Sequence, residues 1–164
     1  MELDLSTVFE QVEHTPEDDN ITPVTNNART EARLIAVQGV YRFLLLADSA
    51  ADIRNTFDNP YLKKRRAHKA HFRKILDAAI SDAPRYREML EPMLSENWQW
   101  ERVGYVEKAI LFCAVAELDV CQDIPMRVVL NEYLTIAHSY FPEGEVKFIN
   151  GVLDKASKLL RDSA

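Results

Sequence analysis

The chain has 164 residues, 47% of them hydrophobic, which is enough for one domain with a buried core. It contains no run of about 20 apolar residues, and its first twelve residues hold three acids and no Lys or Arg, so we expect a cytoplasmic protein without a membrane span or signal peptide. Four scattered glycines exclude a glycine-rich phosphate loop, and two cysteines in an apolar run indicate buried, reduced thiols.

The net charge of −6 is unevenly distributed along the chain. Residues 1–28 contain seven acids and no Lys or Arg, so the remainder carries a net charge of about +1. Within that remainder, residues 63–74 form a basic block with seven Lys and Arg. Because local charge decides whether a surface attracts a nucleic acid, the overall acidity does not exclude an RNA partner.

Residues 1–27 combine acids, Thr, Asn and two prolines with few hydrophobic residues after Val12. We expect this segment to be an acidic, disordered tail that precedes a folded domain of residues 28–164. Apolar residues at helical spacing predict a first helix over residues 28–47, and a short helix is expected over 52–57.

The remaining elements also have helical patterns. The basic block leads into a helix whose predicted buried face contains Phe72, Ile75, Leu76 and Ala79. Asp82 and Pro84 predict a stop and restart, and residues 105–120, apolar on every side, predict a helix in the middle of the core. A further helix starts near Pro125 and ends at Pro142 and Gly144. The last helix has an apolar stripe comprising Ile149, Val152, Leu153, Ala156, Leu159 and Leu160. No run has the period of a strand, so we expect an all-α protein with about six or seven helices.

Several short strings, in order and spacing, resemble the NusB family. They occupy residues 106–111, 116–118, 124–125, 131–132 and 147–155, together with Arg33, 36–38 and Tyr41 in the first helix. The resemblance extends over about residues 28–161 and is weakest between 49 and 100. It implies a NusB-like fold of about seven helices in two packed helical subdomains, without a catalytic centre.

The resemblance also implies a function. NusB proteins pair with NusE, a small ribosomal subunit protein, and bind the boxA element of nascent RNA, which helps RNA polymerase read through terminators in ribosomal RNA operons. We therefore expect a transcription antitermination factor that binds boxA-type single-stranded RNA together with NusE, within an RNA polymerase antitermination complex. Family members occur as monomers and as dimers, so a homodimer stays open. The alternative is a protein-interaction module of the same fold with weak or lost RNA binding.

The first helix carries the main candidate RNA site. Arg29 and Arg33 lie one turn apart near its start, where arginines and free backbone N–H groups can bind phosphate. The residues alone allow two solvated surface arginines, but the resemblance favours RNA contact. The RNA-binding set that it implies is Arg29, Thr30, Arg33, Gln38, Lys147 and Phe148. Relatives often have a run of arginines here, whereas this chain has Glu31, which repels phosphate.

Two further surfaces follow from the same reasoning. The basic block could add phosphate contacts that depend on salt concentration, or it could be a solvated helix start. It could also be a counter-charge for the acidic tail. In that case the tail would mimic RNA and shield the basic surface. Phe148 could stack a base or belong to the core. The resemblance also implies a NusE-binding set of Tyr41, Glu101, Glu107 and Lys108.

The sequence contains no coherent catalytic or metal site. His68 and His71 are three residues apart, but neither Cys nor a carboxylate accompanies them at ligand spacing. Cys113 lies in the most apolar segment, where a thiol is inert. We therefore expect no enzyme, no bound metal and no cofactor.

Overall fold

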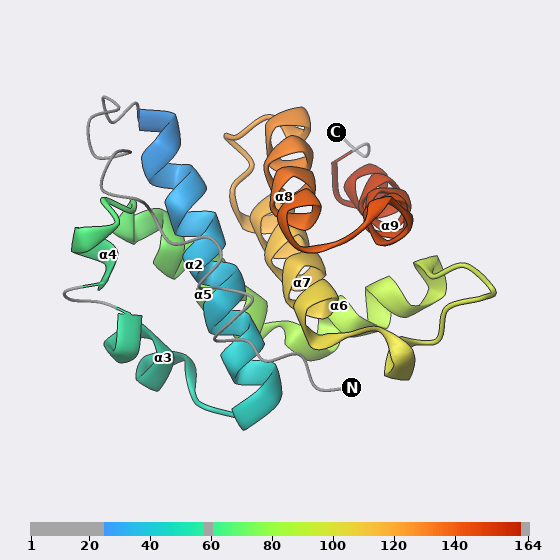
Figure 1. Cartoon of the computed structure of the whole chain (residues 1–164), viewed down its shortest axis with the longest axis horizontal. Coiled ribbons are helices and arrows are strands. Elements are labelled where there is room, and N and C mark those ends of the chain that lie inside the picture. Colours follow the sequence, from blue (N-terminus) through green and yellow to red (C-terminus); the bar gives the residue numbers. More distant parts are fainter. Residues whose placement is uncertain (1–24, 58–60, 162–164) are drawn as a thin grey trace.

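The computed structural model describes residues 25–57 and 61–161, and these residues form helices and no strand (Figure 1). The α-helices are α2 (Thr25–Leu46), α3 (Ala50–Phe57), α4 (Tyr61–Lys64), α5 (Lys69–Ser81), α6 (Ala83–Leu90), α7 (Tyr105–Val120), α8 (Met126–Tyr140) and α9 (Glu143–Arg161). Two short 3-10 helices, η2 (Glu91–Met93) and η3 (Trp100–Arg102), lie between α6 and α7. The all-α prediction is confirmed. None of these helices is both long and apolar enough to cross a membrane.

The observed helices differ from the predicted ones in several places, and α3 begins at Ala50, two residues before its predicted start. Helix α2 begins at Thr25, three residues before the predicted start, and the greater part of the expected acidic tail, residues 1–24, lies outside the described residues. The short helix α4, which ends in the first two residues of the basic block, was not predicted. Gly144 does not end α8 but lies in the first turn of α9, because the break between these two helices is confined to Phe141 and Pro142.

Helix α7 is the centre of the fold. It contacts α2, α5 and α6 from the first half of the chain and α8 and α9 from the second half (Figure 1). A helix that is surrounded in this way needs apolar side chains on all sides, which residues 105–120 supply. The two predicted helical groups are therefore present, and they share one continuous hydrophobic core.

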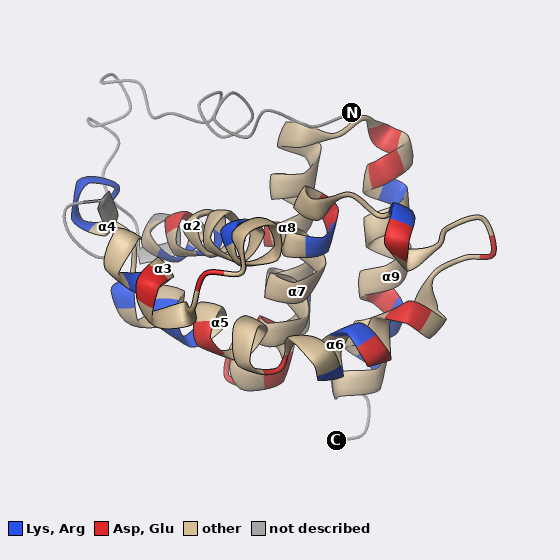
Figure 2. Cartoon of the chain, turned by 90° about the horizontal axis from the view of Figure 1, so that it is seen from below, with Lys and Arg blue, Asp and Glu red and all other residues tan. Residues whose placement is uncertain are grey.

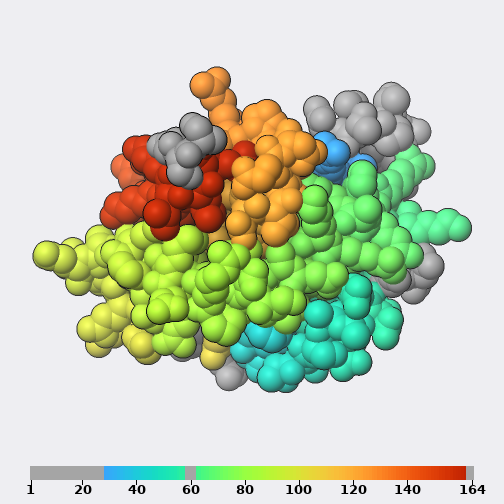
Figure 3. Space-filling view, turned by 180° about the vertical axis from the view of Figure 1, so that it is seen from behind, coloured from blue at the N-terminus to red at the C-terminus, as the bar shows by residue number. Residues whose placement is uncertain are grey.

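Helices α5 and α6 cover the rear of the molecule (Figure 3). Asp82 separates them: its backbone N–H closes the last turn of α5, and Pro84 lies in the first turn of α6, as predicted. The predicted face of α5 is buried. The predicted stripe of α9 is wrong at Leu159, which is 59% exposed, because the last turn of α9 faces the core through Ser157 and Leu160 instead.

A side chain from the last helix caps the end of α7. The Arg161 guanidinium donates to the carbonyl oxygens of Leu118 at 2.8 Å, Cys121 at 3.0 Å and Ile124 at 2.8 Å. Carbonyl groups at a helix C-terminus lack intrahelical donors and attract positive charge. Arg161 therefore fixes the end of α9 to α7 and to the turn before α8.

Both cysteines are free and buried, as predicted. Burial raises the pKa of the Cys113 thiol, and the nearby Glu117 carboxylate raises it further. Burial likewise raises the pKa of Cys121 to about 11. Both thiols therefore stay protonated and unreactive at neutral pH.

Candidate nucleic-acid interface

The start of α2 presents a partly exposed basic group. Arg29 makes no ion pair with any residue in the described ranges 25–57 and 61–161. Its neighbour Thr30 donates its hydroxyl to the Glu132 carboxylate of α8, at 3.0 and 3.1 Å from the two oxygens. Thr30 thus connects α2 to α8, and Arg29 is the arginine of this helix start that remains available to an anion.

The expected exposure of Arg33 beside Arg29 is wrong. Arg33 is 2% exposed, and its guanidinium binds the buried Glu117 carboxylate of α7, with Nη2–Oε2 at 2.7 Å and Nε–Oε1 at 2.9 Å. Its Nη1 lies 3.3 Å from Glu132. This bidentate pairing orients the side chain into the core, where a phosphate cannot reach it.

Four helices contribute to the buried polar network around Glu117. Tyr133 of α8 donates its hydroxyl to Glu117 Oε1 at 2.9 Å, and His71 Nε2 of α5 lies 3.4 Å from Oε2. Burial alone would raise the pKa of Glu117, but the neighbouring His71 ring and the hydrogen bonds and charge of Arg33 lower it to about 2. Glu117 is therefore ionised and connects α2, α5, α7 and α8.

A signal for this network was present in the sequence. Glu117 is the carboxylate inside an otherwise apolar stretch of α7, and a buried carboxylate requires a cationic partner. Arg33 lies one turn before Val37 and two turns before Val40, on the stripe of α2 that enters the core. The periodicity alone does not separate Arg33 from Arg29, which lies one turn earlier on the same side of α2, so the signal was the carboxylate in α7.

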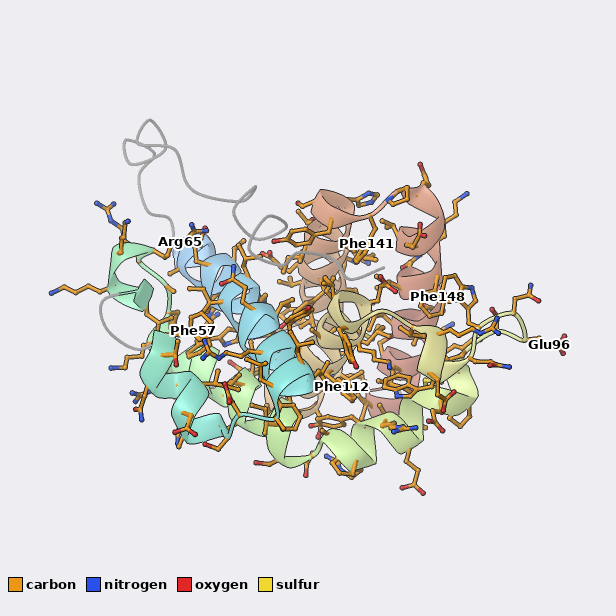
Figure 4. All side chains as sticks on the ribbon, turned by 60° about the horizontal axis from the view of Figure 1, so that its bottom comes forward. Phe57, Arg65, Glu96, Phe112, Phe141 and Phe148 are labelled. Carbon is orange, nitrogen blue, oxygen red and sulfur yellow. The ribbon has the colours of Figure 1, made fainter. Side chains whose placement is uncertain are left out.

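The other members of the expected RNA set occupy two places. Gln38 is buried within α2. Lys147 is exposed and Phe148 is half-buried in the second turn of α9, and α8 separates them from α2 (Figures 1 and 4). Trp98, which sequence reasoning did not select, stacks on Phe148 with ring centroids 4.2 Å apart and planes at 16°. Since one face of Phe148 is covered, Trp98 and Phe148 form a joint aromatic surface.

The expected NusE-binding residues gather near the end of α2 and the start of α7. The Tyr41 ring meets Tyr105 edge-on, with centroids 6.2 Å apart, and the Lys108 amino group lies 5.5 Å from the Tyr105 centroid and 5.1 Å from that of Trp100. Glu101 is 73% exposed. Tyr105, whose side chain is also exposed, was not selected from the sequence.

Glu107 has a different environment from the one expected. Its carboxylate accepts the Gly104 backbone N–H at 2.9 Å, and the side chain is buried at the start of α7. Burial raises the pKa of Glu107, and the hydrogen bond from Gly104 opposes that rise. Glu107 thus caps its own helix, whereas Glu101 is an exposed carboxylate that pairs at 3.6 Å with the exposed Arg87.

Comparison with known proteins decides the family. The sequence model of the NusB family matches residues 30–158. The chain belongs to the NusB family. The transcription antitermination protein NusB of Proteus mirabilis is 37% identical over 134 residues, which cover 82% of this chain and 96% of that protein. The family assignment made from the short sequence strings is therefore confirmed, and this is a family of transcription antitermination proteins, not of enzymes.

Solved NusB structures have the same fold. T. maritima NusB superposes with a TM-score of 0.68 at 26% identity and covers 79% of this chain and 90% of its own. A second solved structure is the crystal structure of the antitermination factors NusB and NusE in complex with dsRNA. The matched chain has a TM-score of 0.68 at 24% identity, and the match covers 80% of this chain and 97% of that chain. The predicted NusB-like fold is confirmed.

The described ranges contain no group of three or more His, Cys, Asp or Glu side chains that could hold a metal ion. Lys and Arg instead gather on α4 and the turn that follows it, as Figure 2 shows. The described surface offers exposed cations, exposed carboxylates and the stacked rings of Trp98 and Phe148, and these groups can bind a partner.

Proposed function

We propose that this protein is a transcription antitermination factor that binds boxA-type single-stranded RNA together with NusE. In this role it promotes read-through by RNA polymerase and thereby ribosomal RNA synthesis. The observation that carries the proposal is NusB-family membership over residues 30–158. A protein of the same fold forms a complex with NusE and dsRNA, which supports NusE and an RNA as partners.

The RNA surface that we propose comprises Arg29, Thr30, Lys147 and Phe148. Arg29 supplies the phosphate contact at the start of α2, where backbone N–H groups add positive potential. The aromatic pair of Phe148 and Trp98 offers a stacking surface for an unpaired base, and the exposed Lys147 is adjacent in sequence. Arg33 and Gln38 act from inside the fold by holding α2 in place.

The NusE surface that we propose is centred on Glu101 and Tyr105. The exposed Glu101 carboxylate suits a basic partner, and the exposed Tyr105 edge offers apolar contact. Tyr41 and Lys108 hold the Tyr105 ring between them. Glu107 contributes by capping the helix that carries Lys108.

A second candidate function, a protein-interaction module with weak RNA binding, is favoured by one observation. The burial of Arg33 leaves Arg29 as the unpaired arginine at the described start of α2. Fluorescence anisotropy with a labelled boxA-type RNA, with and without NusE and across a salt series, separates the two functions. Binding by the complex supports antitermination, and binding by neither protein nor complex favours the interaction module.

Two variants connect that assay to the surfaces. Arg29→Gln should weaken RNA binding several-fold without changing NusE binding, because one phosphate contact is lost. Glu101→Lys should weaken NusE binding and leave the RNA affinity of the isolated protein unchanged. Arg102→Gln, an exposed cation next to Glu101 on η3, is the matched charge control for Arg29→Gln.

A further inference from the structure

A surface next to the start of α2 carries cations that the described part of the chain does not neutralise. Three exposed cations, which we call the basic edge, lie on α4 and the turn after it. They are Lys63, Lys64 and Arg66. None of them makes an ion pair with residues 25–57 or 61–161. In the rear view, the α4 segment protrudes at one edge of the molecule (Figure 3).

Contacts with α2 hold the basic edge beside the proposed RNA site. The His68 backbone N–H donates to the Ala28 carbonyl at 2.9 Å, so the turn before α5 rests on the first turns of α2. The intervening Arg65 is 9% exposed and binds the Glu31 carboxylate at 2.9 Å (Figure 4). Arg29 follows Ala28 directly, so the turn before α5 lies beside the helix start that carries Arg29.

The Arg65–Glu31 pair also removes an obstacle to phosphate binding. Glu31, two residues after Arg29, would repel a phosphate if its charge were not compensated. Because Arg65 occupies its carboxylate, the surface from Arg29 to Arg66 keeps its positive character. Arg65 is therefore a positioning and neutralising residue, and the three exposed side chains are the contacts.

The backbone at Arg66 is also unusual. Its φ of 53° lies in the left-handed region, where a side chain costs stability and glycine is preferred. The Arg66 N–H donates to the Lys63 carbonyl at 3.1 Å and the Ala67 N–H to that of Leu62 at 2.9 Å, the bonding pattern that closes a helix C-terminus. An arginine thus occupies a site where glycine would stabilise the fold more, in keeping with a binding role for its charge.

We propose that the basic edge binds the sugar-phosphate backbone of the same RNA, outside the nucleotides contacted at the start of α2, and that it does so independently of sequence. This inference rests on the proposed RNA-binding function and assigns it a second contact surface. Flexible lysines and an arginine without base-reading neighbours suit phosphates rather than base edges. The acidic segment of residues 1–19 is the competing occupant, and the test below separates it from RNA.

The test uses the full chain, with and without NusE, and two labelled probes. One is a short boxA-type RNA, and the other is the same RNA extended by about ten uridines at each end, so that added phosphates can reach the basic edge. The variant Lys63→Gln, Lys64→Gln, Arg66→Asn removes the three cations. The control variant Arg85→Gln, Arg102→Gln, Lys158→Gln removes three exposed cations from α6, η3 and α9, far from α4 (Figure 1).

We expect the extended RNA to bind the parent and the control more tightly than the short RNA, and the basic-edge variant to lose this gain. With about 0.7 counterions released per phosphate contact, three contacts steepen the salt dependence by about two units. From about 50 to about 200 mM salt, the parent should therefore lose about 20-fold more affinity for the extended RNA than the basic-edge variant loses.

A single variant separates binding from folding. Arg66→Gly should raise the melting temperature, because the left-handed backbone is relaxed, and at the same time weaken binding of the extended RNA. A purely structural role for Arg66 would move both measurements in the same direction.

The failure of this inference differs from failure of the proposed function. If the complex with NusE does not bind the short RNA, the proposed function is wrong. If it does, and the basic-edge variant binds the extended RNA like the parent with an unchanged salt slope, the inference is overturned. Tighter RNA binding by that variant also overturns it and identifies the acidic segment as the occupant.

Discussion

The ion pair between Arg33 and Glu117 makes the most demanding prediction. Replacing Glu117 with Gln removes the charge that Arg33 binds at 2.7 Å and leaves the guanidinium buried with Glu132, 3.3 Å away, as its carboxylate partner. Breaking one side of a buried pair costs about 3–5 kcal/mol, because the other charge remains desolvated. We expect the free energy of unfolding, measured by urea denaturation with circular dichroism, to fall by that amount.

A double variant tests the reason for that loss. Arg33→Met combined with Glu117→Met removes both buried charges, and it should cost less than Glu117→Gln alone, since apolar side chains of similar size replace such pairs well. Tyr133→Phe, which removes one hydroxyl donor to Glu117, is the control and should cost about 1 kcal/mol. A loss below about 1 kcal/mol for Glu117→Gln, or a double variant that costs more than Glu117→Gln, refutes the reasoning.

The same double variant tests the role of Arg33 in RNA binding. If the guanidinium acts only inside the fold, a folded Arg33→Met, Glu117→Met protein should bind boxA-type RNA like the parent. Arg29→Gln measured beside it should bind more weakly. Lost RNA affinity in a double variant that melts normally would show that Arg33 contacts RNA after all.

Three further predictions concern stability. The pKa of Glu117 in the folded protein is about 2, below its ordinary 4.5, so its ionisation contributes about 3 kcal/mol to the free energy of unfolding above pH 4.5. This contribution is lost as the pH falls towards 2. Over this pH range, the urea midpoint should therefore fall less steeply in Glu117→Gln than in the parent protein. Arg161→Met should cost about 1–3 kcal/mol in urea unfolding, because the carbonyls of Leu118, Cys121 and Ile124 lose a charged donor. An unchanged midpoint would mean that water replaces the guanidinium. Gly39→Ala should lower the melting temperature by several degrees, because an added Cβ would lie 2.9 Å from Leu76 and 3.0 Å from Ile53. Overpacking of about 1–3 kcal/mol exceeds the gain in helix propensity of about 1 kcal/mol. A higher melting temperature would show that both side chains move aside.

The helices were predictable because their signals are local. Apolar spacing determines α5, α7 and most of α9, and Asp82 with Pro84 determines the break after α5. The short α4 escaped prediction because four residues are too few for a periodic pattern. The family was recognisable for a related reason, since its strings lie in these same regular segments.

What only the tertiary structure decided is which charges reach the surface. Arg29 and Arg33 are equivalent in type and one turn apart, yet Arg33 pairs with a carboxylate 84 positions away, in a helix that only folding brings close. The position of the basic block beside α2 depends on the contact between His68 and Ala28, which are also distant in sequence. Sequence alone thus determines the helices and the family, whereas the binding surface depends on pairings between side chains that only the packed helices bring together.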